Sequence, residues 1–264
     1  MRVDMIEICC GSFEDAVCAW KAGADRIELN CALELGGLTP SVASLKLVKK
    51  YTDLKVICMV RPRPAGFCYT KYQYEQAKLE AQDLLRAGAD GLSFGFLMED
   101  GTLDENRIQE FTELCHAYDG QAVFNRAFDV SADDLYWEDQ DETMIRKLID
   151  LGVDRLLTSG KRQSALEGSD TLFEFENMYN DEIEIMAASG ILPENVEDLL
   201  NDSEVVHIHA SCKAYAPDKT TSGTSVSFEV AGLPYKDSYQ VVDSIEVKRL
   251  IGIASLINPD TVDI

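Results

Sequence analysis

The sequence contains few basic residues and very few histidines. Its 264 residues include 24 Lys and Arg against 47 Asp and Glu, a formal net charge of −23, and 3 histidines. Such an excess of negative charge repels phosphate backbones and anionic lipid surfaces. We therefore expect neither nucleic acid nor an acidic membrane as a partner, and the choice of histidine ligands or bases is narrow.

Long apolar runs and paired cysteines are also missing. No window approaches the ~20 apolar residues that cross a bilayer, and Asp4 and Glu7 interrupt the N-terminal stretch where a signal peptide would be apolar. The 8 cysteines form no C-x-x-C pair and lack the density of a secreted disulfide framework. We expect reduced thiols and a cytoplasmic protein.

Several common phosphate and metal motifs do not occur. The chain has no P-loop, no H-E-x-x-H and no G-x-G-x-x-G after an apolar run. What it does have is a hydrophobic fraction of 46%, which is enough to build a folded core. The acidic residues are therefore predicted to coat a globule.

An internal repeat organises the chain. Residues 22–29 (AGADRIEL), 87–94 (AGADGLSF) and 151–158 (LGVDRLLT) each hold a Gly, an Asp and an apolar run, the pattern of a helix end followed by a buried strand. Gly23, Gly88 and Gly152 are 65 and 64 positions apart. Half of this spacing, about 32 residues, is the length of one strand, one helix and two loops.

Strand-length apolar runs occur at eight places in alternation with helical patterns. Five are residues 5–10, 54–60, 122–128, 182–187 and 205–210, and three are the apolar runs that end the repeats at 22–29, 87–94 and 151–158. This alternation predicts an α/β fold, a (β/α)8 TIM barrel, as one domain over residues 1–264. A doubly wound open sheet is the competing architecture. Residues 214–240 are predicted to form a long loop before a closing helix at 242–257.

Polar residues late in the predicted strands are the candidates for a functional site, because barrel enzymes build their sites at the carboxyl ends of the strands. Alternation along each strand assigns an inward face. The polar, sulfur-containing and charged residues on that face are Glu7, Cys9, Arg26, Glu28, Asn30, Met59, Arg61, His207, His209 and Ser211.

Two interpretations of the charged residues stay open. In one, Glu7, Glu28 and Arg26 form a buried ion-pair layer without chemistry. In the other, Arg61 and Arg126 grip a small anion carrying phosphate or carboxylate. The anion interpretation also recruits Arg26, Asp129, Ser159, His209, Ser211 and the loops at 187–190 and 210–213, with Glu7 or Glu28 as acid or base.

A soft-metal interpretation uses the sulfur-containing residues. Cu(I) prefers thiolate and thioether ligands, so Cys9, Met59 and Cys31 are the candidate copper set, with His209 as an imidazole ligand. The alternative is that the cysteines are apolar core fillers. His207 is expected in the interior. The acidic run at 133–142 is expected to be a solvated loop that enters a helix.

Several motifs together resemble the CutC family, known as copper-homeostasis proteins. They are IEIC (6–9), GADRIEL (23–29), GGLTPS (36–41), RPR (61–63), FNRAFD (124–129), LTSG with SALEG (157–168), PEN (193–195) and HAS (209–211). They run in family order over most of the chain. The resemblance implies a (β/α)8 barrel and copper as the ligand.

The chain departs from the family pattern at three places. Of the two cysteines proposed in the family as copper ligands, the first matches Cys9, whereas the second falls on Asn30, and Cys31 is displaced by one residue to the opposite strand face. Asn125 replaces a family His, and the glycine-rich loop after the seventh strand is reduced to 188–190 (ASG).

Three hypotheses follow from the residues and the resemblance. The chain is a cytoplasmic copper-handling barrel that binds Cu(I) weakly, or an enzyme or binder of a small anion at the barrel mouth, or a structural protein whose arginines are saturated by its own carboxylates. Exposed helices around a closed barrel often support dimers, so a homo-oligomer is a further expectation.

Overall fold

Eight parallel strands close into a barrel in chain order, with β1 paired to both β2 and β8. The computed structural model describes residues 3–132, 144–221, 225–226, 228, 234–235 and 237–256. The strands are β1 (Met5–Cys10), β2 (Arg26–Leu29), β3 (Lys55–Met59), β4 (Gly91–Phe94), β5 (Gln121–Phe124), β6 (Arg155–Thr158), β7 (Glu184–Ala188) and β8 (His207–Ala210). The TIM-barrel prediction is confirmed, and the open sheet is wrong because pairing of β1 with β8 leaves the barrel without an edge strand.

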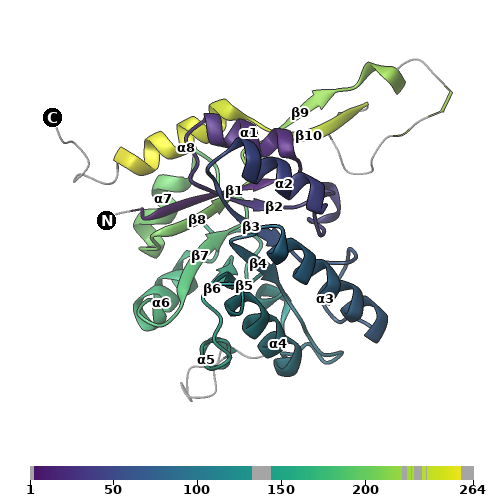
Figure 1. The fold of residues 1–264 in the computed structure, drawn as a ribbon. Coiled ribbons are helices and arrows are strands. Elements are labelled where there is room, and N and C mark those ends of the chain that lie inside the picture. The colour runs from purple at the N-terminus through teal and green to yellow at the C-terminus, as the bar shows by residue number, and fades with distance from the viewer. Residues whose placement is uncertain are drawn as a thin grey trace.

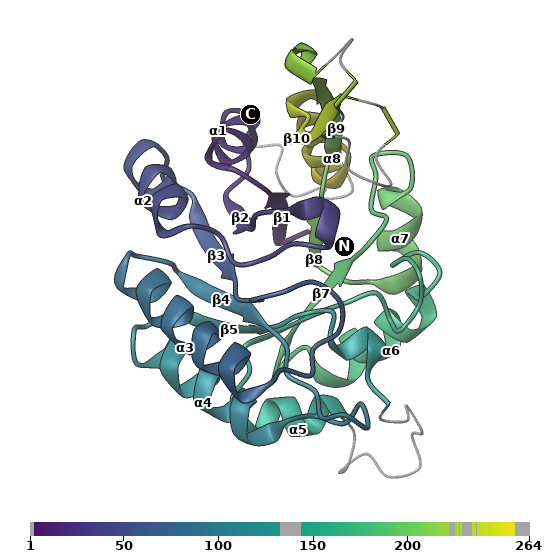
Figure 2. The same cartoon turned by 90° about the vertical axis from the view of Figure 1, so that its right-hand side faces the viewer.

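Helices surround the barrel (Figures 1 and 2). They are α1 (Phe13–Lys21), α2 (Val42–Tyr51), α3 (Lys71–Arg86), α4 (Glu105–His116), α5 (Met144–Asp150), α6 (Ser169–Tyr179), α7 (Val196–Ser203) and α8 (Ser244–Leu256). In the described part of the chain, no helix has the length and apolar character needed to span a bilayer. The acidic run at 133–142 lies outside the described residues.

The repeated Gly and Asp residues join each helix to the next strand. The three glycines adopt left-handed backbone just after α1, α3 and α5, with φ values of 102°, 97° and 78° at Gly23, Gly88 and Gly152. The Asp90 carboxylate accepts a hydrogen bond of 2.7 Å from the backbone N–H of Val56, and Asp154 accepts one of 2.7 Å from Ala122. In the repeat, the Gly therefore ends a helix, and the Asp side chain forms a hydrogen bond with the backbone of the neighbouring strand.

The fifth strand is shorter than its apolar run predicts. It ends at Phe124 instead of continuing to Phe128, because the Asn125 side chain accepts a 2.9 Å hydrogen bond from the N–H of Ala127 and turns the chain. A short 3₁₀ helix, η2 (Phe128–Val130), follows. Arg126 consequently lies in a turn beyond the strand end.

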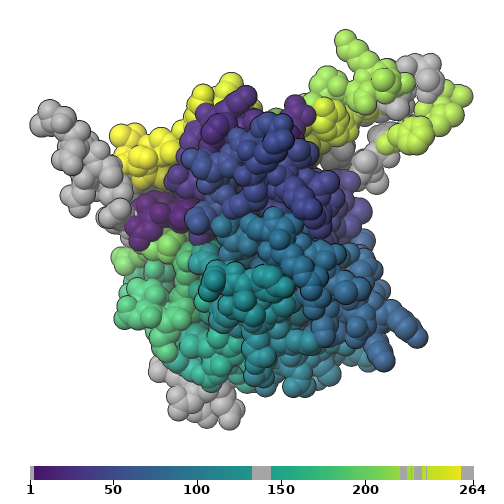
Figure 3. Space-filling model, in the orientation of Figure 1, coloured from purple at the N-terminus to yellow at the C-terminus, as the bar shows by residue number. Residues whose placement is uncertain are grey.

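The segment predicted as a long loop at 214–240 contains regular structure. Strands β9 (Lys213–Pro217) and β10 (Ser238–Val242) pair antiparallel and form an arm that projects from the barrel (Figures 1 and 3). Pairing satisfies backbone groups that a loop would leave to water. The closing helix α8 begins at Ser244, two residues later than predicted, because Val242 belongs to β10.

The interior of the barrel has an apolar side and a charged side. Ile57, Val123, Leu157, Met186 and Ala188 form a separate apolar cluster contributed by β3, β5, β6 and β7. The larger core lies between the strands and the surrounding helices. Strands β1, β2 and β8 instead present carboxylates, a thiol and imidazoles inward, and Arg155 on β6 and Glu184 on β7 add a further ion pair to the interior.

Candidate functional site

A pocket of about 470 Å³ opens at the carboxyl ends of the strands, and we call it the mouth pocket. Eight of the predicted site residues line it, namely Cys9, Glu28, Met59, Arg61, Arg126, Asp129, His209 and Ser211. Its volume is in the range of small-molecule sites. The loops after β7 and β8 also form part of its wall, as predicted, through Ser189, Gly190 and Ser211.

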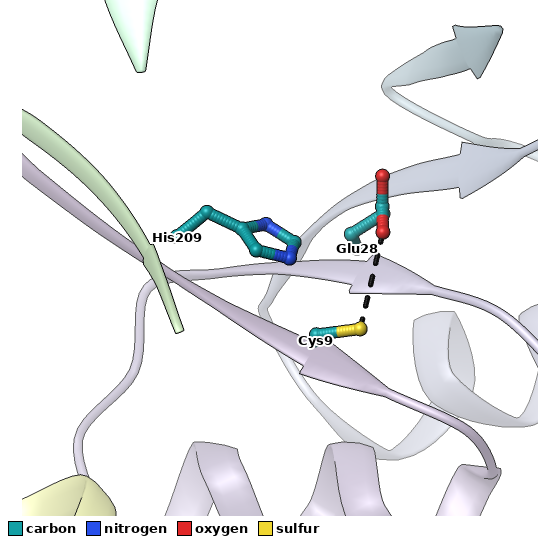
Figure 4. A group of neighbouring side chains, drawn as sticks. All are labelled: Cys9, Glu28 and His209. Carbon is teal, nitrogen blue, oxygen red and sulfur yellow. Dashed lines mark hydrogen bonds between the residues drawn. The ribbon is translucent and has the colours of Figure 1, made fainter. Parts of the chain in front are cut away.

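Cys9, Glu28 and His209 meet at the floor of the mouth pocket (Figure 4). Their ligand atoms all lie within 4.8 Å of one another. The barrel register explains this meeting, because Cys9 on β1 stands beside Glu28 on β2, while β8 pairs with the other edge of β1. A thiol, an imidazole and a carboxylate at this spacing could hold a metal ion.

Glu7 lies below His209 and orients it. The Glu7 carboxylate is 2.8 Å from Nδ1 of His209 and 2.9 Å from Nε of Arg26. Burial opposes the charge of Glu7, but the hydrogen bond with His209 and the nearby positive charges lower its pKa to about 2. Because Nδ1 of His209 faces Glu7, the other ring nitrogen, Nε2, is left for a ligand, the usual arrangement behind a metal-bound histidine.

The protonation of His209 and Cys9 is set by the same surroundings. Burial alone would lower the pKa of His209, yet its hydrogen-bonding contacts with Cys9 and Glu7 raise it well above the ordinary value. Burial raises the pKa of the Cys9 thiol, with further contributions from the charges of Glu28 and Glu7. A metal that binds here must therefore displace protons from both groups.

Asn30 connects the cluster; the sequence placed it on the inward face, but neither the copper nor the anion hypothesis gave it a role. Its Nδ2 donates a 2.9 Å hydrogen bond to Oε2 of Glu28 and lies 3.5 Å from Sγ of Cys9. The second carboxylate oxygen, Oε1 of Glu28, and Oδ1 of Asn30 are buried and have no hydrogen-bond partner among the described residues. In the sequence, Asn30 is indicated by its position two residues after Glu28, which places both side chains on the same inward face of the strand.

Arg61 lines the mouth pocket, but its guanidinium is occupied by the backbone. One terminal nitrogen donates to the carbonyls of Leu35, Gly36 and Gly37 at 3.0 to 3.2 Å, and the other donates to Ala65 at 2.6 Å. The start of the GGLTPS motif thus surrounds this arginine, with Gly36 and Gly37 at φ values of 86° and 81°. The two-contact grip on an anion predicted for Arg61 does not fit this geometry.

Arg126 is differently placed, since its side chain is 41% exposed at the pocket rim. Nε lies 2.7 Å from Oδ2 of Asp129, and NH2 donates to the hydroxyl of Ser159 at 3.0 Å. No contact in the described part of the chain occupies its remaining nitrogen, NH1. Asp129 and Ser159 therefore orient Arg126, and Ser159 itself is buried outside the pocket lining.

Three further predicted residues lie outside the pocket lining. Glu7 and Arg26 occupy a layer below it, and Arg26 also contacts Glu184 at 3.4 Å. Cys31 lies beside a groove between α2 and α3, where its thiol is 3.1 Å from the carbonyl oxygen of Thr39. The structure does not bring Cys31 to Cys9, because adjacent positions on a strand face opposite sides.

Met59 reaches the mouth pocket from β3. Its sulfur accepts a contact of 3.6 Å from Nδ2 of Asn125, the residue that replaces a family histidine. Lys213, the last residue of the 210–213 loop in the anion interpretation, and Gln240, at the base of the projecting arm, complete the rim. Gln240 was missed because its segment was predicted to be a loop; its signal would have been the short alternating run that forms β10.

Comparison with known proteins places these residues in a family. A family model described as the CutC family matches residues 4–214. A CutC protein of Treponema denticola is 43% identical over 252 residues, which cover 95% of this chain and 99% of that protein. A copper homeostasis protein cutC homolog of Homo sapiens is 33% identical over 251 residues, covering 95% of this chain and 89% of the homolog.

Solved structures agree with the architecture. A CutC protein from Streptococcus agalactiae superposes with a TM-score of 0.70 at 26% identity, covering 78% of this chain and 98% of that chain. KGPDC from Streptococcus mutans superposes with a TM-score of 0.56 at 11% identity, covering 97% of this chain and 99% of its own. The second likeness concerns the fold alone.

Proposed function

The chain belongs to the CutC family, and on that premise we propose that it acts in copper homeostasis by binding Cu(I) weakly in the mouth pocket. The observation that carries this proposal is the convergence of Cys9, Glu28 and His209 within 4.8 Å. Thiolate and imidazole are ligands that copper accepts, and the thioether of Met59 lines the same pocket. The role in copper homeostasis follows the name that the human relative carries.

The geometry also accounts for weak binding. Glu28 contributes a hard oxygen where a second thiolate would favour Cu(I), and Asn30 stands beside it with an amide instead of a sulfur ligand. Cys9 and His209 must both lose protons whose pKa values are raised. We place this activity in the cytoplasm, a compartment that suits a chain whose 8 cysteines are all free thiols.

A competition titration with a Cu(I)-specific chelator tests the site. The reduced protein is compared with Cys9→Ser, and we expect the variant to lose at least about tenfold in affinity, because a hydroxyl is a poor Cu(I) ligand. Cys31→Ser and Cys68→Ser are the matched controls, since one thiol faces a helix groove and the other is exposed. Equal, micromolar-or-weaker binding by wild type and Cys9→Ser would rule out this site.

A second candidate function is the binding of a small anion at the mouth pocket. It is favoured by Arg126, whose NH1 is unoccupied among the described residues, and by Lys213 on the same rim. Titration with inorganic phosphate tests it, and Arg126→Gln should weaken binding by about tenfold, the scale of one charge-assisted hydrogen bond. Arg249→Gln, a surface arginine away from the pocket, is the control.

A further inference from the structure

The two ends of the mouth pocket differ in what they offer a ligand. The rim presents cationic donors from Arg126 and Lys213. The floor presents acceptors, because Oε1 of Glu28 and Oδ1 of Asn30 are buried without a hydrogen-bond partner among the described residues. Glu28 and Asn30 are 3% and 1% exposed, so neither acceptor is compensated by bulk water.

Oε1 of Glu28 belongs to a residue that lines the mouth pocket, and the carboxylate is held in place. Its other oxygen, Oε2, receives the hydrogen bond from Asn30 and faces Cys9, and Figure 4 shows the remaining oxygen directed away from the thiol. A buried acceptor without a donor is destabilising, because it loses its hydration and gains no hydrogen bond in return. Two such atoms on one pocket floor indicate a ligand that carries hydrogen-bond donors.

Charge balance indicates which donors these are. The barrel interior and pocket floor contain the carboxylates of Glu7, Glu28 and Glu184 and the guanidiniums of Arg26, Arg61 and Arg155. These three negative and three positive groups balance one another, and the imidazole of His209 also stands beside Glu7, so the floor needs no further cation. A neutral hydroxyl therefore suits the floor better than an ammonium group, which would bring an uncompensated charge into a buried site.

We infer that the mouth pocket binds a small hydroxylated organic anion, with its hydroxyl groups at Glu28 and Asn30 and its acidic group at Arg126 and Lys213. This inference rests on the second candidate function, anion binding at the mouth pocket. The carboxylate of Glu28 repels the acidic end of the ligand, so the orientation is fixed by charge. A phosphate ester and a carboxylate share this chemistry.

Matched ligand pairs test the inference on the wild-type protein. Calorimetric titration of the reduced, chelator-treated protein compares glycerol 3-phosphate with propyl phosphate, and glycerate with propionate. Each pair differs by the hydroxyl groups alone. We expect the hydroxylated member of at least one pair to bind about tenfold or more tightly, because its analogue leaves the floor acceptors unpaired. The pair with the larger effect identifies the acidic group.

Variants test whether the preference for hydroxylated ligands depends on the floor of the mouth pocket. Glu28→Gln replaces the Oε1 acceptor by a donor and should reduce the hydroxyl preference to about threefold or less, whereas Arg126→Gln should weaken both members of a pair and keep their ratio. Equal affinity within both pairs would overturn the inference but leave anion binding standing. Absence of binding by all four probes and by phosphate would overturn both, and tighter binding of phosphoethanolamine than of glycerol 3-phosphate would overturn the hydroxyl assignment.

Discussion

Two polar regions of the barrel interior differ in how their charged side chains are paired. In the lower layer, which we define as Glu7, Arg26, Arg155 and Glu184, each charge lies beside an opposite charge, with contacts of 2.6 to 3.4 Å. In the mouth pocket, Glu28 and Arg61 have no ion-pair partner among the described residues, and their polar contacts go to an amide and to backbone carbonyls.

This difference separates a supporting region from a binding region. The paired charges of the lower layer hold side chains in place, as Glu7 does for His209. Buried atoms without a hydrogen-bond partner occur in both regions, but Glu28 and Asn30 line a pocket of about 470 Å³, where a ligand could supply the missing donors. Four predictions test whether the two regions differ in this way.

The largest expected effect is on the lower layer. Arg155→Met removes the 2.6 and 2.8 Å contacts to Glu184 and leaves that carboxylate with weaker partners. We expect the free energy of unfolding to fall by about 3 to 5 kcal/mol, as for other broken buried pairs. Urea denaturation at pH 7 measures it. The exposed-pair variant Arg249→Met should be unchanged, and an equally small change in Arg155→Met would contradict the supporting role.

The next effect concerns Glu176, near the lower end of the barrel. Burial, with help from the charge of Glu184, raises the pKa of Glu176 to about 7. Because the folded state holds this proton more tightly than the unfolded chain, stability is lost as pH rises from about 4.5 through 7. Glu176→Gln should therefore be about 2 to 3 kcal/mol more stable than wild type at pH 8 and equal to it at pH 4.

Urea midpoints at the two pH values check this prediction. Glu174→Gln, on the exposed side of the same helix, serves as the control. The same difference between wild type and Glu176→Gln at pH 4 and at pH 8 would show that ionisation of Glu176 is not its cause.

A smaller effect is expected at Arg61. Arg61→Lys keeps the positive charge but loses the planar guanidinium, which donates hydrogen bonds to the carbonyls of Gly36, Gly37 and Ala65 at the same time. We expect a loss of about 1 to 2 kcal/mol in the free energy of unfolding. If lysine were tolerated without loss, the backbone contacts of Arg61 would not be what holds this side of the mouth pocket.

The last effect concerns affinity instead of stability, namely the pH dependence of copper binding. The pKa values of Cys9 and His209 are both raised, so each proton displaced by Cu(I) makes the affinity rise with pH below those values. The slope should reach about tenfold per pH unit for each proton released. Chelator competition between pH 6 and 8 measures it, and His209→Gln should lower the slope. A flat profile would contradict binding through these two groups.

Much of the fold could be read from the order of residues. The Gly and Asp repeat marks where helices end and strands begin, and alternation along β1, β2 and β8 places Cys9, Glu28 and His209 inward. These signals are local, because helix stops and strand faces depend on neighbouring positions. The projecting arm was missed because β9 and β10 are separated by a long stretch of turn-forming residues.

The candidate site could be predicted only in part. The inward register identified Glu7, Arg61 and His209, but it could not say that Arg61 would be occupied by the carbonyls of the β2–α2 loop. Those contacts depend on left-handed glycines folding a loop over a side chain from the next strand. The opposite face of Cys31 could be read from its position next to Asn30, but only the structure showed that its thiol lies 3.1 Å from the carbonyl oxygen of Thr39, beside the groove between α2 and α3.

The sequence by itself determined the alternation of eight strands with helices and the inward face of the first three strands and the eighth, because these follow from local propensity and from period-two alternation. Only the tertiary structure decided which inward residues meet. Glu7 and His209 are 202 positions apart and come to 2.8 Å because β8 closes the barrel against β1. This long-range strand pairing closes the barrel. It produces both the ion-paired lower layer and the mouth pocket, whose acceptors on Glu28 and Asn30 have no partner among the described residues.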